Sequence, residues 1–271
     1  MLTMAGERRL DNFASLIRSV VNDGILGHVI ETGVWRGGMS FYGAAVLQSL
    51  NQMGRRTVYL CDSFSGIPAP KNKSQAQGVD AYAHTLGTDK GVSLEIVQSY
   101  ATVLGFSYES GGPLHFVPGY FNESLPRLMA SNPHLRFSIL RLDGDTYFST
   151  MEALDVLYDA VNHGGYIIID DYTDWETCRR AVLDFRRKRK IEDPIIIVEH
   201  PGNNEIIRGV YWRKALPPCS HHDHVLHAMN PTDVSDLQYL SKLPFGVNIA
   251  LMEGGELHRC LSKAETGHLK S

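Results

Sequence analysis

Hydrophobic positions recur along the first 214 residues with two spacings, one typical of helices and one typical of buried strands. Helical spacing is clear near the start, where Leu10, Phe13 and Ile17 fall on one face and Gly24 ends the run. Short apolar runs that close on a turn or an acidic residue predict strands. We expect seven of them, at residues 28–35, 57–62, 114–121, 137–143, 166–172, 194–200 and 206–214.

The order of these elements predicts the fold class. Strand and helix alternate five times, and the strand at 166–172 is apolar on both faces, which is typical of a central strand in a parallel sheet. We therefore expect an α/β fold with a doubly wound, mostly parallel seven-stranded sheet of the Rossmann-like type. The short connection between the last two strands predicts a C-terminal antiparallel hairpin at one end of this sheet.

Local signals also predict the limits of one helix. Ser149 and Glu152 have the spacing of a capping box, so they predict the start of the helix that follows the fourth strand. Gly164 and Gly165 predict its end.

The hydrophobic periodicity fades after Lys214, and the stretch "ALPPCSHHDH" that follows is rich in turn residues. We expect one domain at residues 1–214 and an extension of unassigned role at 215–271. With 43% hydrophobic and 21% charged residues, the composition is that of a globular protein rather than a disordered chain.

Charge and cysteine content narrow the range of partners and compartments. The net charge of −4 gives no general attraction to nucleic acid or to an anionic membrane, and no apolar run approaches the ~20 residues needed to span a bilayer. The four cysteines lie far apart without a CxxC pair, which favours a reducing environment. The charged start lacks the apolar core of a secretory signal, so a cytoplasmic location is expected. The sequence leaves open whether the protein forms a homo-oligomer.

Carboxylates gather at the ends of the predicted strands. In an open α/β sheet, ligands bind beyond the carboxyl ends of the strands, near the point where the strand order reverses. Four of the first five strands carry acidic residues there, namely Glu31, Asp62, the pair Asp143 and Asp145, and the pair Asp170 and Asp171. The polar groups are therefore expected to converge on one edge of the sheet.

Asp143, Asp170 and Asp171 form the most informative group, because strands four and five are usually neighbours in such sheets. Buried like charges repel and are costly unless a cation or a proton accompanies them. Oxygen-rich clusters suit Mg²⁺, Mn²⁺ or Ca²⁺. The alternative is that single aspartates cap helices, which would explain one of them but not a group at two adjacent strand ends.

The stretch "ETGVWRGG" is a glycine turn between a strand and a helix, which lets the backbone approach a ligand closely. Asp62 follows at the position from which a carboxylate reaches ribose hydroxyls in nucleotide-binding sheets. Together they indicate a ligand with an adenosine-like part, although each alone is also typical of a structural turn or a solvated loop. A Walker lysine motif is missing, which argues against a nucleoside triphosphate.

Eight stretches of the chain resemble, in the same order, the blocks of the macrocin-type O-methyltransferase family. They are "TMAGERRLDN", "IETGVWRGG", "DSFSGIP", "VSLEIVQ", "FVPGYFNESLP", "LRLDGDTYFSTMEALDVLY", "GGYIIIDDY" and "GVYWRK", within residues 3–214. The resemblance implies a class I methyltransferase that uses S-adenosylmethionine. Its acceptor would be a hydroxyl of a small-molecule natural product, on a sugar, another polyol or a phenol, as in antibiotic biosynthesis. Members usually end soon after the last block, whereas this chain continues to Ser271.

The resemblance also implies roles for individual residues. The turn after the first strand would hold the methionine part of the cofactor, the end of the second strand its ribose, and the end of the third its adenine. The residues expected at the cofactor are Glu31, Thr32, Gly33, Val34, Gly38, Ser40, Asp62, Ser63, Phe64, Pro118, Gly119, Tyr120, Phe121 and Asp143. Asp143, Asp170 and Asp171 would bind a divalent ion, usually Mg²⁺, and Asp145 would be the general base.

Several other features carry weaker hypotheses. The polar stretch at 65–91 is a candidate lid, with a disordered loop as the alternative. Tyr147, Tyr172, Trp175 and Trp212 are candidates for the wall of an acceptor pocket. The two tyrosines are favoured because they follow the acidic pairs, and packing in the terminal hairpin is the better interpretation of Trp212. The histidines within 221–227 could bind zinc, although a polar surface tract is commoner. The basic helix at 179–190 could bind nucleic acid, although a solvated helix face is the better interpretation.

Two other functions stay open on the residues alone. The first is a nucleotide-sugar or dinucleotide oxidoreductase on a similar sheet, and the missing GxGxxG motif argues against it. The second is a non-catalytic protein that keeps the cofactor site. The complete set of strand-end aspartates argues against that second function, because a binding module would not need it.

Overall fold

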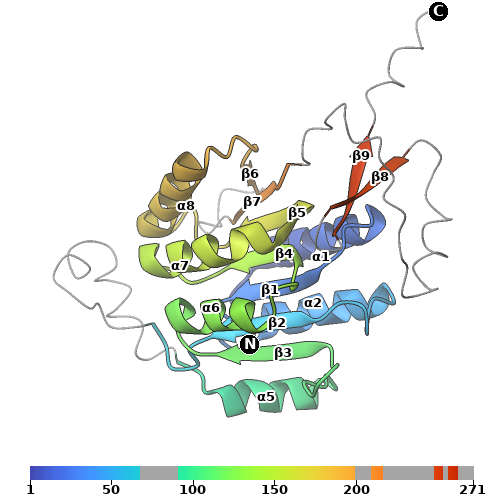
Figure 1. Cartoon of the computed structure of the whole chain (residues 1–271). Coiled ribbons are helices and arrows are strands. Elements are labelled where there is room, and N and C mark those ends of the chain that lie inside the picture. Colours follow the sequence, from blue (N-terminus) through green and yellow to red (C-terminus); the bar gives the residue numbers. More distant parts are fainter. Residues whose placement is uncertain (68–90, 199–208, 216–246, 253–255, 262–271) are drawn as a thin grey trace, which may run out of the picture. The chain divides into compact units, whose positions relative to one another are not determined.

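A computed structural model of the chain describes residues 1–67, 91–198, 209–215, 247–252 and 256–261 (Figure 1). Contacts within the chain divide it into two compact units, Met1–Lys214 and Ala215–Ser271, and each is described by itself. None of the helices in the described ranges is long and apolar enough to cross a membrane.

The first unit contains a seven-stranded sheet. Its strands are β1 (His28–Thr32), β2 (Val58–Asp62), β3 (Leu114–Pro118), β4 (Phe137–Leu142), β5 (Val161–Ile169), β6 (Ile196–Ile197) and β7 (Val210–Arg213). Their order across the sheet is β3-β2-β1-β4-β5-β7-β6. The strands β1 to β5 run parallel, while β7 is antiparallel to both β5 and β6. The mostly parallel architecture with a terminal hairpin, expected from the sequence, is confirmed.

Helices cover both faces of this sheet (Figure 1). One layer consists of α1 (Glu7–Asn22), α2 (Gly38–Ser49) and α5 (Leu94–Val103), and the other of α6 (Phe121–Ser131), α7 (Tyr147–Leu157) and α8 (Glu176–Arg189). Strand residues alternate between the two cores. In β4, Ile139 packs in the core of the first layer, and Leu140 in the core of the second. Because each central strand is buried on both faces, its sequence is apolar almost throughout.

The start of α7 differs from the capping box that the sequence predicts. The N-cap is Thr146, and its side-chain oxygen accepts a hydrogen bond from the backbone N–H of Ser149 at 3.2 Å. Thr146 has the extended backbone typical of an N-cap, with φ −94° and ψ 163°. Ser149 therefore lies in the first turn of α7 rather than ahead of it, and the predicted cap at Ser149 is wrong.

The predicted end of the same helix at Gly164 is also wrong. The helix ends at Leu157, and a short 3₁₀-helix (Tyr158–Ala160) leads directly into β5. Gly164 lies inside this strand, where its N–H donates to the carbonyl of Lys214 at 2.8 Å. The partner of this stretch comes from the far end of the domain, so the local glycine pattern does not reveal the strand.

The second unit contains, in its described part, an antiparallel hairpin. It is formed by β8 (Val247–Met252) and β9 (Glu256–Leu261). The turn-rich extension thus contains regular strands that its weak periodicity does not predict.

Candidate active site

A cavity of about 720 Å³ opens at the carboxyl ends of β1, β2, β4 and β5. Its walls combine residues 2–5 ahead of α1, the glycine turn after β1, the end of β2, the start of α6, and the loops that follow β4 and β5. This edge includes the point between β1 and β4 where the strand order reverses, which is where α/β sheets bind their ligands. The volume is within the range of small-molecule and cofactor sites.

Asp143, Asp170 and Asp171 lie together in this cavity, as the strand ends predict. Each offers one carboxylate oxygen, and these three oxygens lie within 4.8 Å of one another. Burial and the neighbouring charge of Asp143 raise the pKa of Asp171 well above its usual range. Burial and the charge of Asp170 likewise raise the pKa of Asp143. Crowding of this kind is relieved by a proton or by a bound cation.

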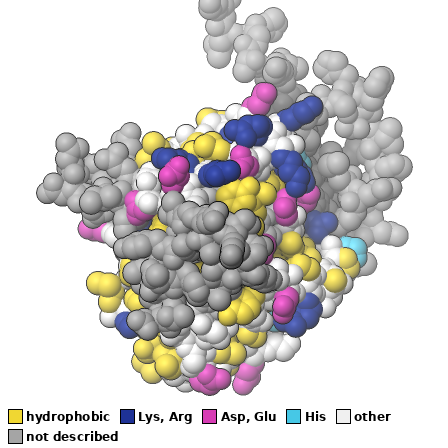
Figure 2. Space-filling model, turned by 90° about the vertical axis from the view of Figure 1, so that its left-hand side faces the viewer, with side chains coloured by type: hydrophobic (Ala, Val, Ile, Leu, Met, Phe, Trp, Pro, Cys, Tyr) yellow, Lys and Arg dark blue, Asp and Glu magenta, His cyan; other side chains and the backbone are white. Residues whose placement is uncertain are grey.

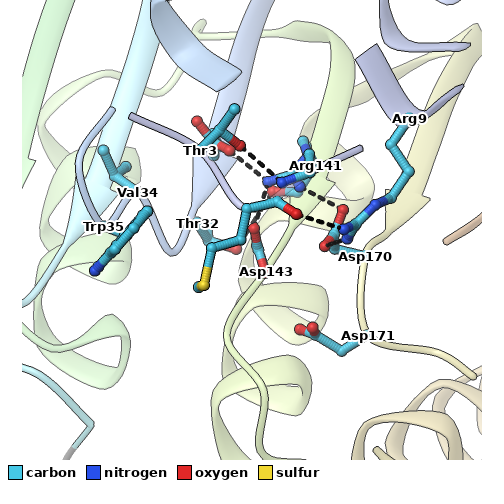
Figure 3. Close-up of polar contacts among 12 residues, drawn as sticks. Thr3, Arg9, Thr32, Val34, Trp35, Arg141, Asp143, Asp170 and Asp171 are labelled. Carbon is cyan, nitrogen blue, oxygen red and sulfur yellow. Dashed lines mark hydrogen bonds and ion pairs between the residues drawn. The ribbon is translucent and has the colours of Figure 1, made fainter. Parts of the chain in front are cut away.

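Two buried arginines reach into the acidic cluster, and the sequence patterns predict neither (Figure 3). Arg141, on β4, donates hydrogen bonds to the carboxylates of Glu31 and Asp170. It also donates to Asp143 Oδ2 at 2.8 Å. Arg9, on α1, donates to the second oxygen of Asp170. The available signal is the lone arginine within the apolar run of a central strand, because a charge buried there requires partners.

Asp145 lies beside the cluster, on the short turn that joins β4 to α7. Its φ of 60° is left-handed, a conformation that aspartate tolerates better than most residues. Its backbone N–H donates to Asp171 Oδ2 at 3.2 Å, which fixes the two residues relative to each other. Asp145 lines the cavity, and left-handed non-glycine residues of this kind cluster at functional sites.

The charge of this region is negative in sum. Five carboxylates, those of Glu31, Asp143, Asp145, Asp170 and Asp171, line the cavity around two guanidinium groups, those of Arg9 and Arg141. The two arginines offset part of the repulsion without cancelling it. The cavity therefore favours an additional cation over an additional anion at the cluster.

The glycine turn after β1 is braced by Asp62 from the end of β2. Asp62 Oδ2 accepts hydrogen bonds from the backbone N–H groups of Val34 at 2.7 Å and Trp35 at 3.1 Å. Asp62 Oδ1 accepts from the N–H of Phe64 at 2.8 Å. Asp62 thus has a structural task besides any contact with a ligand. A carboxylate has about four acceptor positions, so it can also accept a hydrogen bond from a ligand hydroxyl.

Gly38 packs against the N-terminal segment of the same chain. Its N–H donates to the carbonyl of Leu2 at 3.1 Å, and a Cβ added to Gly38 would lie 2.5 Å from that oxygen. Residues 2–5 therefore form a wall of the cavity against the start of α2. The glycine is required by this packing, and its expected role at the cofactor stays a prediction.

The residues predicted at the cofactor divide into two groups. Those that line the cavity are Glu31, Gly33, Val34, Gly38, Asp62, Ser63, Tyr120, Phe121 and Asp143. Thr32, Ser40, Phe64, Pro118 and Gly119 are not among the residues that line it. Ser40 is fully buried behind Glu31 and donates a hydrogen bond to it. Burial raises the pKa of Glu31 to about 7, against the lowering effect of Arg141.

The aromatic wall of the cavity agrees with the prediction only in part. The hydroxyl of Tyr147 donates to Asp184 Oδ2 at 3.2 Å, and Tyr172 packs on the core of the second helix layer. Trp175 lines the cavity as predicted, and Phe148, which was not predicted, lines it as well. Because α7 begins at Tyr147, ahead of the predicted start at Ser149, both Tyr147 and Phe148 lie on the helix. Neighbouring residues on a helix point about 100° apart, so Phe148 faces the cavity while Tyr147 faces away from it.

The basic end of α8 is compensated by acidic neighbours. Arg187 pairs with Asp184 at 2.8 Å, Lys188 with Asp155 at 3.3 Å, and Arg189 with Asp159. Figure 2 views the side of the molecule on which α8 lies, and basic and acidic side chains are intermingled there. This arrangement favours the solvated helix face over a nucleic-acid patch. Residues 68–90 of the candidate lid and the histidines within 221–227 lie outside the described residues.

Comparison with known proteins gives a family match over the whole first unit. The model of the macrocin O-methyltransferase (TylF) family matches residues 1–214. The 8-demethyl-8-(2,3-dimethoxy-alpha-L-rhamnosyl)-tetracenomycin-C 4'-O-methyltransferase of Streptomyces olivaceus is 37% identical over 211 residues, covering 78% of this chain and 75% of that protein. The mycinamicin III 3''-O-methyltransferase of Micromonospora griseorubida is 34% identical over 215 residues, covering 79% and 78% of the two chains.

Solved structures agree with this match. The O-methyltransferase NovP superposes with a TM-score of 0.69 at 33% identity, over 79% of this chain and 82% of NovP. The calicheamicin methyltransferase CalS11 superposes with a TM-score of 0.59 at 21% identity, which is a similarity of fold. Both cover a part of the chain about as long as the first unit.

Proposed function

The chain belongs to the macrocin O-methyltransferase family and is a methyltransferase, and on this premise we propose that it methylates a sugar hydroxyl of a small-molecule natural product. The methyl donor would be S-adenosylmethionine, and a divalent cation, Mg²⁺ first, would be required. The family membership sets aside the oxidoreductase alternative. A sugar is the favoured acceptor because one relative is named for a rhamnosyl-tetracenomycin substrate.

One observation carries this proposal, which is that the braced glycine turn and the acidic cluster face the same cavity. Gly33 and Asp62 line it at the ends of β1 and β2, while Asp143 and Asp171 line it at the ends of β4 and β5. A donor held by the turn and an acceptor held by the cluster would therefore meet in one space. Methyl transfer depends mainly on such placement of the two reactants.

The residues of the cavity fit the methyl donor. Asp62 has acceptor capacity for ribose hydroxyls, and the Glu31 carboxyl would accept a hydrogen bond from the amino group of the methionine part. Arg9 lines the cavity, and its guanidinium would attract a carboxylate of the ligand. S-adenosylmethionine supplies an already activated methyl group, which leaves orientation of the reactants as the task of these residues.

The cluster also fits a divalent ion. Asp143, Asp170 and Asp171 present carboxylate oxygens that converge within 4.8 Å, and oxygen is the ligand that Mg²⁺ and Ca²⁺ prefer. A divalent ion, when bound, lowers the pKa of a coordinated hydroxyl. Burial and the mutual repulsion of the carboxylates raise the pKa values of Asp143 and Asp171, and a bound cation would relieve this repulsion.

Asp145 is the proposed general base. It lines the cavity next to the cluster but does not belong to the group of three converging oxygens. Its carboxylate would accept the proton of the acceptor hydroxyl as the methyl group is transferred. General acid–base catalysis contributes on the order of 10²–10⁴ in rate.

The test uses labelled S-adenosylmethionine, Mg²⁺ and a panel of glycosides and phenols to find an acceptor, followed by variants. Asp145→Asn keeps the left-handed backbone accessible, so it should bind S-adenosylhomocysteine as the wild type does and lose at least about a hundredfold in rate. Asp174→Asn is the matched control, because Asp174 lines the same cavity without an assigned role. It should keep a rate close to that of the wild type.

Three outcomes would contradict parts of the proposal. A wild-type rate for Asp145→Asn would show that another group accepts the proton. Full activity after exhaustive treatment with EDTA would show that the reaction does not require a divalent ion. Absence of calorimetric binding of S-adenosylhomocysteine to the wild type would contradict the assignment of the donor site.

A further inference from the structure

Arg9 joins two parts of the cavity with a single guanidinium group. Its Nη1 donates to Asp170 Oδ2, and its Nη2 donates to the backbone carbonyl of Met4 at 2.9 Å. Arg9 is 8% exposed and lines the cavity, where its bond to Asp170 is buried and its bond to Met4 is partly buried. Figure 3 shows its side chain reaching from α1 toward Asp170.

The Met4 carbonyl belongs to the wall formed by residues 2–5. This wall is tied to the start of α2 through the bond from Gly38 N–H to Leu2 O at 3.1 Å. Within it, the N–H of Ala5 donates to Thr3 Oγ1 at 3.0 Å. Arg36 donates from outside the cavity to the carbonyl of Met1 at 3.1 Å. Arg9 therefore connects the wall to the acidic cluster, whereas Arg36 contacts the residue just ahead of the wall.

Asp170 is held from two independent directions. Arg141 reaches its Oδ1 from β4, in the interior of the sheet, and Arg9 reaches its Oδ2 from α1. Loss of Arg9 would leave Asp170 attached to the sheet but free of the wall. Arg141 thus anchors Asp170 to the sheet, and Arg9 fixes the orientation of the Asp170 carboxylate relative to the wall.

We propose that Arg9 is a positioning residue that couples the donor site to the divalent-ion site. A ligand that packs against residues 2–5 restrains the Met4 carbonyl, which restrains the Arg9 guanidinium, which orients Asp170 toward the cluster. An ion at Asp170 acts on the wall through the same contacts in reverse. The inference rests on the proposed function, and it predicts positive coupling with the same factor in both directions, because coupling free energies are reciprocal.

The experiment measures binding of S-adenosylhomocysteine by calorimetry with and without saturating Mg²⁺, and binding of Mg²⁺ with and without saturating S-adenosylhomocysteine. In the wild type we expect each ligand to tighten the other at least about fivefold. In Arg9→Met the factor should fall to about one. Arg36→Met is the matched control, since it removes an arginine contact next to the wall without touching the cluster, and it should keep the wild-type factor.

Arg9→Lys separates the coupling from a general loss of structure. A lysine ammonium is a point charge that can stay near Asp170 but cannot present the planar fork that reaches two partners in fixed directions. We therefore expect Arg9→Lys to melt close to the wild-type temperature and to bind Mg²⁺ alone normally, while the coupling factor is lost. A merely structural role would change stability and both affinities together.

The outcomes separate an error in the proposed function from an error in the role of Arg9. If the wild type binds neither ligand, the proposed function itself is wrong. If the wild type binds both ligands but shows no coupling, the inference about Arg9 is overturned and the proposed function stands. The same holds if Arg9→Met and Arg9→Lys keep the wild-type factor.

Discussion

Gly33 lies where the ends of β1 and β4 come into backbone contact. Its φ is 89°, and a Cβ at this position would lie 1.7 Å from the carbonyl oxygen of Asp143. Since Asp143 is one of the three clustered aspartates, the absence of a side chain at Gly33 fixes how closely the glycine turn approaches the cluster. The glycine is therefore explained by contact between two strand ends, before any ligand is considered.

Gly33→Ala should lower the free energy of unfolding by about 3 kcal/mol or more, because backbone strain and a backbone clash add. Gly54→Ala is the matched control, since Gly54 has a φ of 82° but nothing within 4 Å of an added Cβ. It should cost only the left-handed strain, about 1–2 kcal/mol. Urea denaturation measures both. Equal losses of stability in the two variants would show that the ends of β1 and β4 can move apart to accommodate the added Cβ.

The Glu31 carboxyl gives the protein a specific pH dependence. Its pKa of about 7 in the folded protein lies above the value near 4.3 in an unfolded chain, so the folded state binds the proton more tightly. The stability contributed by this proton is present below pH ~4.3 and is lost as the pH rises toward 7, by on the order of 1 kcal/mol per unit.

Glu31→Gln removes this titration. In EDTA, the free energy of unfolding of the wild type relative to Glu31→Gln should fall from pH 5 to pH 7 and level off above it. Urea titrations at pH 5, 6, 7 and 8 measure the difference. If the wild type instead became more stable relative to Glu31→Gln as the pH rises, Arg141 would lower the pKa of Glu31 by more than burial raises it.

At the scale of single residues, the sequence predicts the clustered aspartates better than the arginines that bind them. Asp143, Asp170 and Asp171 are predictable because the carboxyl ends of neighbouring parallel strands meet at one edge. Arg9 and Asp170 are 161 positions apart, and their contact depends on how α1 packs on the sheet. A pattern of spacing along the chain does not contain that information.

Among the elements, α7 carries the residues that follow β4 into the cavity. Its N-cap is Thr146, which is buried and lines the cavity. The first turn of α7 presents Phe148 to the same space. The direction in which this helix begins therefore decides which aromatic side chain lines the cavity.

Thr146→Ala should cost about 1 kcal/mol of stability, because the N–H of Ser149 loses its acceptor. Thr146→Ser keeps the hydroxyl and should stay within a few tenths of a kcal/mol of the wild type. Chemical denaturation of the three proteins makes the comparison. If Thr146→Ala were as stable as the wild type, the helix would begin elsewhere.

The strands of the first unit were predictable, while several of their limits and the hairpin of β8 and β9 were not. The strands β2 and β4 lie within one residue of their predicted limits, because burial leaves a nearly continuous apolar run. The strands β1 and β3 begin where predicted but end three residues earlier, where the glycine turns begin. The capping box at Ser149 failed because Thr146, three residues earlier, offers the same hydroxyl on an extended backbone. The end at Gly164 failed because β7, distant in sequence, supplies the pairing partner.

At the scale of the whole molecule, the first unit has the contacts of a self-sufficient domain. Its two described hydrophobic cores draw on residues from Phe13 to Trp212. The buried Lys214 closes the domain, as its Nζ donates to the carbonyls of Tyr158 at 3.0 Å and Val161 at 2.6 Å. The domain boundary expected from the sequence at 214 stays a prediction about independent folding.

A protein that ends at residue 215 should therefore unfold cooperatively, with a melting temperature near that of the full chain. It should also bind S-adenosylhomocysteine with similar affinity. Thermal melts followed by far-UV circular dichroism, and calorimetry, measure these properties. A broad melt or an insoluble product would show that the extension takes part in the fold of the first unit.

The three tryptophans of the chain are distributed in a way that makes them optical reporters. Trp35 and Trp175 line the cavity, whereas Trp212 is fully buried in the core beside Arg186, whose guanidinium lies 4.9 Å from its ring. A ligand that enters the cavity will perturb the emission of the first two tryptophans and leave the third unchanged. Intrinsic fluorescence of the unlabelled protein can therefore separate occupancy of the cavity from loss of the core within one spectrum.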